Sequence, residues 1–163
     1  MPSKVSEVYL GVDPGIADTG FGVIKKEKGK MICLAYGSIK TAAHTPLFDR
    51  LAILHKHLNE IIVKFKPDVV SVEELFFCKN VKTALVVGQA RGVILLTIKQ
   101  QGLLMMEFTP LQVKQAVSTY GKAEKGQVQR MVKMLLNLKE IPKPDDAADA
   151  LAIAICAANS VKL

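Results

Sequence analysis

The sequence predicts an α/β domain in which helices pack on a mixed β-sheet. Three short apolar stretches, separated by glycine-containing turns, open the chain and are typical of an antiparallel meander. Strand-like and helical stretches then alternate, which is typical of strands joined by helical crossovers. The chain has 163 residues and is 50% hydrophobic, so we expect one domain, 1–163, with a substantial core.

The first half of the chain contains four predicted strands and one helix. The three meander strands are expected at residues 8–12, 20–25 and 31–38. Thr45 and Pro46 then supply an N-cap and a first helical residue for an amphipathic helix over 46–65, which Pro67 ends. The β-branched run 69–73 follows that helix, so it predicts a strand pairing in parallel with the first.

The second half is predicted to contain four helices and one strand. These are a helix at 79–100, a strand at 103–108, and helices at 110–117, 128–135 and 145–159. Gly88 and Gly92 predict that the first of these helices is interrupted or tightly packed there. Thr109 and Pro110 repeat the cap-and-proline signal, and the closing helix is so rich in Ala, Leu and Ile that we expect it to be buried.

Composition excludes several classes of protein. No apolar run approaches the roughly 18 residues of a spanning helix, so we expect no membrane association. The N-terminus lacks the apolar core of a secretory signal, and three widely spaced cysteines suit a reducing cytoplasm. The net charge of +7 favours polyanionic partners. The histidines form no zinc pattern, and the chain has no phosphate-binding P-loop motif.

Four acidic residues stand among apolar neighbours at the ends of predicted elements. Asp13 ends the first strand and Glu73 the fourth, at the sheet edge where α/β proteins bind ligands. Asp146 and Asp149 are three residues apart, on one face of the closing helix. Asp145, four residues from Asp149, fits that face as well, so spacing alone leaves the choice open.

Gathered carboxylates repel one another unless a hard divalent cation neutralises them, which predicts a Mg²⁺ site. Two such ions about 4 Å apart can activate water and stabilise the leaving oxygen in phosphodiester hydrolysis. Taken singly, each acid also has an ordinary explanation. Asp13 can form a turn, Glu73 can pair with a cation, and Asp146 and Asp149 can favour a helix N-terminus.

Basic residues flank this predicted acidic pocket. Residues 75–106 contain no acid, and residues 110–139 contain one, Glu124. The cations in these two stretches are Lys79, Lys82, Arg91, Lys99, Lys114, Lys122, Lys125, Arg130, Lys133 and Lys139. Such a distribution suits phosphate-backbone binding, although a solvated helix face has the same composition. Phe76 is placed to stack on an unpaired base, although a core position is the usual role of phenylalanine.

Several motifs, in order along nearly the whole chain, resemble the RuvC family of crossover junction endodeoxyribonucleases, the bacterial Holliday junction resolvases. The matching segments are 10–15 (LGVDPG), 19–24 (TGFGVI), 72–73 (VE) with Phe76, Lys79 and Asn80, 88–92 (GQARG), 112–115 (QVKQ), 123–125 (AEK) with 127–129 (QVQ), and 146–152 (DAADALA). The chain departs from the family pattern in two added acids, Glu74 and Asp145, and in an N-terminal extension.

The resemblance implies a ribonuclease H-like fold with a five-stranded sheet, a homodimer, and paired nicks across a four-way DNA junction. It assigns metal binding and catalysis to Asp13, Glu73, Asp146 and Asp149, and favours Asp146 over Asp145. Its junction-contacting lysines match Lys114 and Lys125, and its stacking aromatic matches Phe76. It also implies a branch-migration motor as partner.

We therefore expect two Mg²⁺ per subunit, with Mn²⁺ as a substitute, Asp13 as the bridging ligand, and products with a 5′-phosphate and a 3′-hydroxyl. Lys79, Arg91 and Lys122 are further expected DNA contacts. Two other classes stay open: a ribonuclease H-like nuclease for RNA:DNA hybrids or flaps, and a non-catalytic junction-binding or actin-like nucleotide-binding protein. A dimer interface on the helix at 80–100 or on the closing helix is equally compatible with the sequence.

Overall fold

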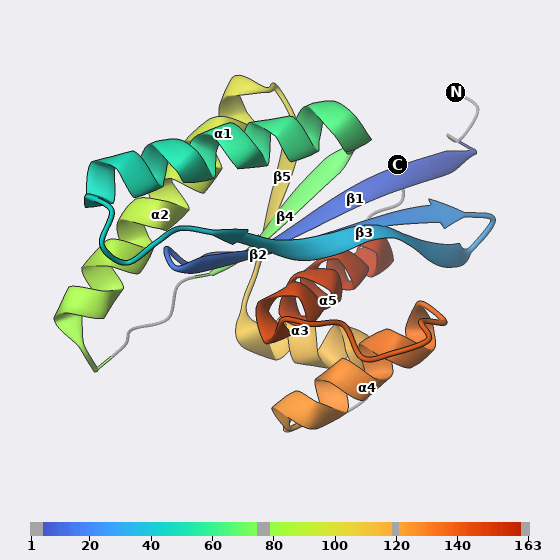
Figure 1. Cartoon of the computed structure of the whole chain (residues 1–163). Helices are drawn as coiled ribbons and strands as arrows, with labels where there is room; N and C mark the ends of the chain where they lie inside the picture. The colour runs from blue at the N-terminus through green and yellow to red at the C-terminus, as the bar shows by residue number, and fades with distance from the viewer. Residues whose placement is uncertain (1–4, 75–78, 119–120, 161–163) are drawn as a thin grey trace.

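A computed structural model describes residues 5–74, 79–118 and 121–160. Five strands form one sheet in the order β3-β2-β1-β4-β5 (Figure 1). Their bounds are β1 Ser6–Asp13, β2 Asp18–Glu27, β3 Lys30–Lys40, β4 Val69–Glu73 and β5 Leu104–Phe108. The first three strands pair antiparallel, whereas β4 runs parallel to β1 and β5 parallel to β4. The predicted mixed sheet is confirmed.

The meander strands extend beyond their predicted ends. β2 and β3 continue to a two-residue turn at Lys28 and Gly29, which have φ values of 49° and 79°. Positive φ at both turn positions matches the twist of a tight hairpin, so the polar residues next to the turn stay in the ladder. Apolar periodicity alone does not mark those polar ends as strand.

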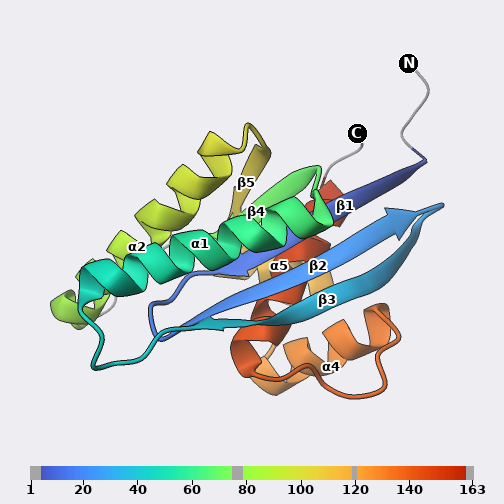
Figure 2. The same ribbon diagram turned by 45° about the horizontal axis from the view of Figure 1, so that its top comes forward.

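Helices cover both faces of the sheet (Figures 1 and 2). The helices are α1 Leu47–Phe65, α2 Val81–Gln100, α3 Pro110–Val117, α4 Lys125–Leu135 and α5 Asp145–Ser160. One hydrophobic cluster lies between the sheet and the α1–α2 pair and includes Leu10 and Ile94. The other lies on the opposite face, between the sheet and α5 and between α5 and the helices α3 and α4, and includes Tyr9 and Leu151.

The predicted helix starts are partly confirmed. Thr109 caps α3 with a reciprocal capping box, as its sequence signal indicates. At α1, however, Pro46 is the residue before the helix and no side chain caps it, so the expected Thr45 cap is wrong. The helix α2 is continuous, and a Cβ added at Gly92 would meet nothing within 4 Å, so tight packing at that glycine is also wrong.

The closing helix approaches the sheet unusually closely. A Cβ added at Gly11 of β1 would lie 2.0 Å from the carbonyl oxygen of Ala150, and one at Gly20 of β2 would lie 2.0 Å from that of Asp146. Only glycine leaves room for the backbone of α5 at these two positions. The predicted burial of this helix is confirmed, and its first turn lies beside the end of β1.

The apolar composition of α2 has a different origin. Among the described helices, α2 is the one that is long and apolar enough to cross a membrane by length and composition, which is weak evidence for such a role. One side of the helix buries Ala90, Ile94 and Ile98 in the core. The other side exposes Val81, Leu85 and Leu96. The hydropathy of α2 therefore reflects one packed apolar side and one uncovered apolar side.

Candidate functional site

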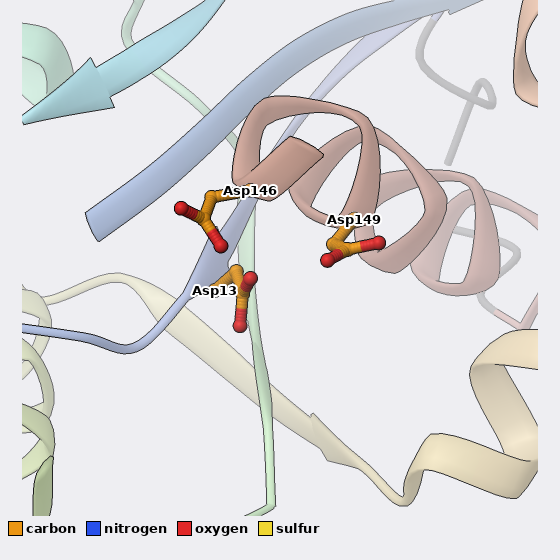
Figure 3. A group of neighbouring side chains, drawn as sticks. All are labelled: Asp13, Asp146 and Asp149. Atoms are coloured by element: carbon orange, nitrogen blue, oxygen red, sulfur yellow. The ribbon is translucent and has the colours of Figure 1, made fainter. Parts of the chain in front are cut away.

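Three of the four predicted acids form one group at the edge of the sheet. Asp13 ends β1, and Asp146 and Asp149 lie in the first turns of α5. One carboxylate oxygen from each lies within 4.8 Å of the other two, and Figure 3 shows the three side chains facing a common space. The parallel pairing of β1 with β4 and the close seating of α5 bring together residues far apart in the sequence.

The fourth predicted acid, Glu73, lies beside this group. Val12 pairs with Val72, so the next residue of each strand, Asp13 and Glu73, emerges at the same edge. Glu73 and Asp149 line one hollow of about 260 Å³ together with Lys114 and Lys125. Glu73 and Asp13 line a second hollow of about 140 Å³ on the α2 side. Glu73 therefore lines both hollows, one with Asp149 and the other with Asp13.

Burial and mutual repulsion raise the pKa of three carboxyl groups, those of Asp13, Glu73 and Asp149. Burial, followed by the charges of Asp149, Glu73 and Asp146, raises the pKa of Asp13 from 3.8 to about 8. Burial also raises the pKa of Asp149 and of Glu73, against the opposing charges of Lys125 and Lys114 respectively. Clustered oxygen ligands that resist ionisation without a counter-charge suit a hard divalent cation.

The structure distinguishes Asp146 from Asp145. Asp146 belongs to the aspartate group, whereas Asp145 is exposed and turned toward α4. There it lies 3.3 Å from the Lys125 ammonium and accepts a 3.0 Å hydrogen bond from the Gln129 amide. Lys125 also lies 3.8 Å from Asp149. Spacing along the helix did not separate the two acids, because both lie within its first turn.

The predicted basic contacts lie in three settings. Lys114 on α3 and Lys125 at the start of α4 line the larger hollow beside Glu73. Lys79 and Lys122 are exposed in the segments before α2 and α4. Arg91 on α2 lines the smaller hollow, and its guanidinium bonds to other protein groups. Phe76, the predicted stacking residue, lies outside the described residues.

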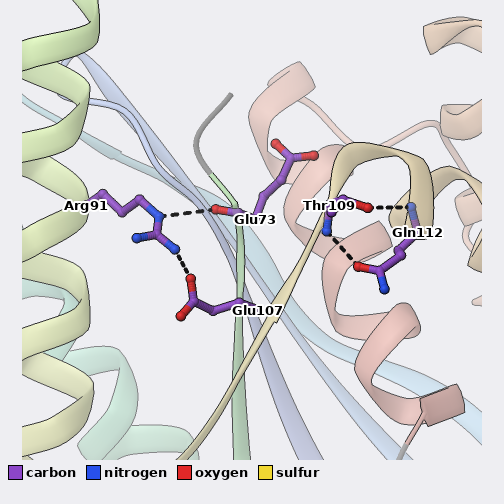
Figure 4. A network of polar contacts seen from close by, with 5 residues as sticks. All are labelled: Glu73, Arg91, Glu107, Thr109 and Gln112. Carbon is purple, nitrogen blue, oxygen red and sulfur yellow. Dashed lines mark hydrogen bonds and ion pairs between the residues drawn. The ribbon is translucent and has the colours of Figure 1, made fainter. Parts of the chain in front are cut away.

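Arg91 belongs to a polar network that sequence reasoning did not find. Its Nη2 contacts the carboxylate of Glu107 on β5, and its Nε donates a 3.5 Å hydrogen bond to the main-chain carbonyl of Glu73 (Figure 4). On the other side of Glu73 in the same view, Thr109 and Gln112 form the capping box of α3. The signal for this network in the sequence is Glu107, the first acid after the acid-free stretch 75–106.

Comparison with known proteins agrees with this geometry. The family model described as crossover junction endodeoxyribonuclease RuvC matches residues 9–157. The protein of that name from Halothermothrix orenii is 60% identical over 156 residues, which cover 96% of this chain and 94% of that protein.

Two solved structures show the same fold. The structure of T. thermophilus RuvC in complex with Holliday junction substrate is 37% identical, with a TM-score of 0.85, over 93% of this chain and 92% of that one. The yeast mitochondrial Holliday junction resolvase is 17% identical, with a TM-score of 0.68, over 91% and 76%, and resembles this chain in fold. The mixed five-stranded sheet and its helices are those of a ribonuclease H-like fold. On the family match and these identities, the chain belongs to the RuvC family of crossover junction endodeoxyribonucleases.

Proposed function

We propose that this chain is a structure-selective endonuclease that resolves four-way DNA junctions by paired symmetric nicks. The observation that supports this function most directly is the aspartate group at the sheet edge, with two lysines lining the adjoining hollow, in a chain of the RuvC family. The acidic group suits hydrolysis at phosphorus, and the lysines suit a polyanionic substrate. The solved structure of T. thermophilus RuvC in complex with Holliday junction substrate supports this choice of substrate.

Asp13, Asp146 and Asp149 would hold the catalytic divalent cation, and Glu73 would complete a second position. The fit rests on three hard oxygen donors within 4.8 Å of one another and on partial burial, which raises the pKa of Asp13 and Asp149. We propose two Mg²⁺ ions, with Mn²⁺ as a substitute and Asp13 as the shared ligand. When bound, these ions supply activation of the attacking water and stabilisation of the leaving 3′-oxygen.

The protein side chains would hold the DNA so that one phosphate reaches the acids. Lys114 and Lys125 line the hollow that adjoins Glu73 and Asp149, so their ammonium groups would bind phosphates on either side of the scissile bond. Lys79 and Lys122 would contact the backbone farther away. Phe76 would stack on a base at the opened centre of the junction, as the family pattern predicts.

Paired nicks require two active sites, so we also propose a homodimer. The uncovered side of α2 supports this assembly, because Val81, Leu85 and Leu96 are exposed by 72%, 64% and 57%. Gly92 lies exposed on the same helix, so a second helix would meet no side chain there. Replacing Leu85 with Glu is expected to give monomers in light scattering, and an unchanged dimer would exclude this surface.

Two further expectations follow from the family and are proposed on that ground. The chain would act in the cytoplasm of a bacterial cell, and a branch-migration motor would deliver the junction to it. Both concern the setting of the reaction, and the test of the reaction itself requires neither.

The proposed reaction is tested with a mobile four-way junction beside linear duplex, RNA:DNA hybrid and flap substrates, each in Mg²⁺ and in EDTA. We expect symmetric, Mg²⁺-dependent nicks in the junction alone, and their loss in the Asp146→Asn variant. Glu140→Gln, which removes an exposed acid outside the group, is the matched control. Preferential cutting of the hybrid would reject the substrate, and tight binding without cutting would reject the catalytic assignment.

A further inference from the structure

We propose that Arg91 is a positioning residue for Glu73: Glu107 orients its guanidinium, which holds the last peptide of β4 so that the Glu73 carboxylate faces the aspartate group. The proposal rests on the catalytic role proposed for that group. It gives Arg91 a task other than the DNA contact that its charge first suggests.

The contacts place Arg91 within the protein. Its side chain is 17% exposed, and both of its partners belong to the two strands that lead into the site. Nη2 contacts the carboxylate of Glu107 on β5, and Nε donates to the carbonyl oxygen of Glu73 on β4. In the sheet Glu107 pairs with Val72, next to Glu73, so one guanidinium spans the ends of two neighbouring strands.

The register of the sheet explains why this carbonyl needs a donor from outside the ladder. The N–H of Glu74 bonds to the carbonyl of Phe108, so the main chain of Glu74 faces β5, and by alternation that of Glu73 faces β1. Continuing the pairing of Val12 with Val72 places residue 14 opposite the Glu73 carbonyl. Residue 14 is a proline and has no N–H to donate. Arg91 supplies the donor that the proline lacks.

The same geometry keeps the positive charge of Arg91 away from the Glu73 carboxylate. Figure 4 shows the carboxylate directed away from the guanidinium, which meets Glu107 instead. The neighbouring charges that shift the pKa of the Glu73 carboxyl group are those of Asp149 and Lys114. Arg91 therefore holds the backbone of Glu73 and leaves its carboxylate available to a cation. Outer contacts of this kind fix the direction of metal ligands.

A DNA contact and a positioning contact predict opposite behaviour for Glu107. If Arg91 binds phosphate, loss of Glu107 frees the guanidinium and leaves DNA binding equal or tighter. If Arg91 positions Glu73, loss of Glu107 releases the guanidinium from the strand ends and harms catalysis as much as loss of Arg91. The isosteric variant Glu107→Gln therefore separates the two roles.

The experiment compares Arg91→Gln, Arg91→Lys, Glu107→Gln and the control Lys56→Gln, which removes an exposed charge from the neighbouring helix α1. Single-turnover junction cleavage is measured in Mg²⁺, and junction binding is measured in EDTA over a range of salt. We expect cleavage to slow about 10- to 100-fold in Arg91→Gln and in Glu107→Gln, with partial recovery in Arg91→Lys and no change in Lys56→Gln. Junction affinity and its salt dependence should stay at the wild-type values.

Two further readouts make the outcome independent of activity and of folding. Mn²⁺ binding to the DNA-free protein should weaken about tenfold in both Arg91→Gln and Glu107→Gln. An unchanged melting temperature of Glu107→Gln would show that the fold is intact. Weaker junction binding with a salt slope lower by about one in Arg91→Gln, with Glu107→Gln still fully active, would overturn the proposal in favour of a DNA contact. If the wild-type protein does not cut junctions, the proposed function fails, and Mn²⁺ affinity still decides the role of Arg91.

Discussion

Replacing Asp13 with asparagine is expected to stabilise the metal-free protein. Burial and neighbouring acids raise the pKa of Asp13 from 3.8 to about 8, so at pH 7 the folded state keeps a proton that the unfolded chain has released. About three pH units separate 3.8 from pH 7, at 1.36 kcal/mol each. Asparagine resembles the protonated acid in shape and never ionises. The free energy of unfolding of the Asp13→Asn variant in EDTA should therefore exceed that of the wild type by up to about 4 kcal/mol.

The pH dependence of the free energy of unfolding tests the same prediction independently. Between about pH 4 and pH 8 the folded wild type binds one more proton at Asp13 than the unfolded chain, so its stability without metal falls as the pH rises. The contribution is complete below pH 4 and lost as the pH passes through about 8. Asp13→Asn should lose the part of this slope that Asp13 contributes and keep the part from Glu73 and Asp149, whose pKa is also raised. Urea unfolding in EDTA at several pH values measures both proteins, with Glu140→Gln as the control.

Mg²⁺ should remove much of this difference. The wild type gains stability from a cation that binds the folded state alone, about 2.7 kcal/mol at a concentration one hundred times the dissociation constant. The variant lacks the proposed shared ligand and should gain little. It should also bind junction DNA without cutting it. Equal stability of the two proteins in EDTA across this pH range, or junction nicking by the variant near the wild-type rate in Mg²⁺, would refute the reasoning.

Three further substitutions test separate parts of the structure. Gly11→Ala should lower the melting temperature by about 5 °C or more, because its Cβ would lie 2.0 Å from a carbonyl oxygen of α5 and overpacking costs about 1–3 kcal/mol. Lys125→Gln should weaken junction binding and lower its salt slope by about one, and an unchanged slope would remove Lys125 from the DNA contacts. Asp145→Asn should keep Mn²⁺ binding, whereas Asp146→Asn should lose it. If Asp145→Asn lost Mn²⁺ binding and Asp146→Asn kept it, Asp145 would be the metal ligand in place of Asp146.

The sequence predicts the parts of the site that depend on local signals. Asp13 stands before Pro14 and Gly15, which force a turn, and Glu73 closes a β-branched run, so both carboxylates could be placed at strand ends. The parallel pairing of these two strands follows from the helix between them. The antiparallel meander, the closing helix and the α3 cap are predicted on similar grounds and are confirmed.

The remaining features depend on contacts between distant segments. Asp145 and Asp146 share a helix turn, and only the position of α4 turns Asp145 toward Lys125. In the sequence, Arg91 is one cation among several, and its contact with Glu107 depends on where the fold places β5. The missed features are pairings across elements, which no local periodicity encodes.

The placement of the acids depends as much on neutral residues as on charge. Repulsion among Asp13, Asp146 and Asp149 favours their separation, so something must hold the start of α5 against β1. Close backbone contact at Gly20 fixes the first turn of α5, the hydroxyl of Ser71 donates a 3.2 Å hydrogen bond to Ile153 in the middle of the helix, and the ammonium of Lys26 donates a 2.5 Å bond to Ala158 near its end. None of these residues would touch a cation or DNA at the acidic site. The helix is thus held along its length, and the energy that assembles the carboxylates comes from packing on the sheet and from hydrogen bonds that sheet side chains donate to the helix backbone.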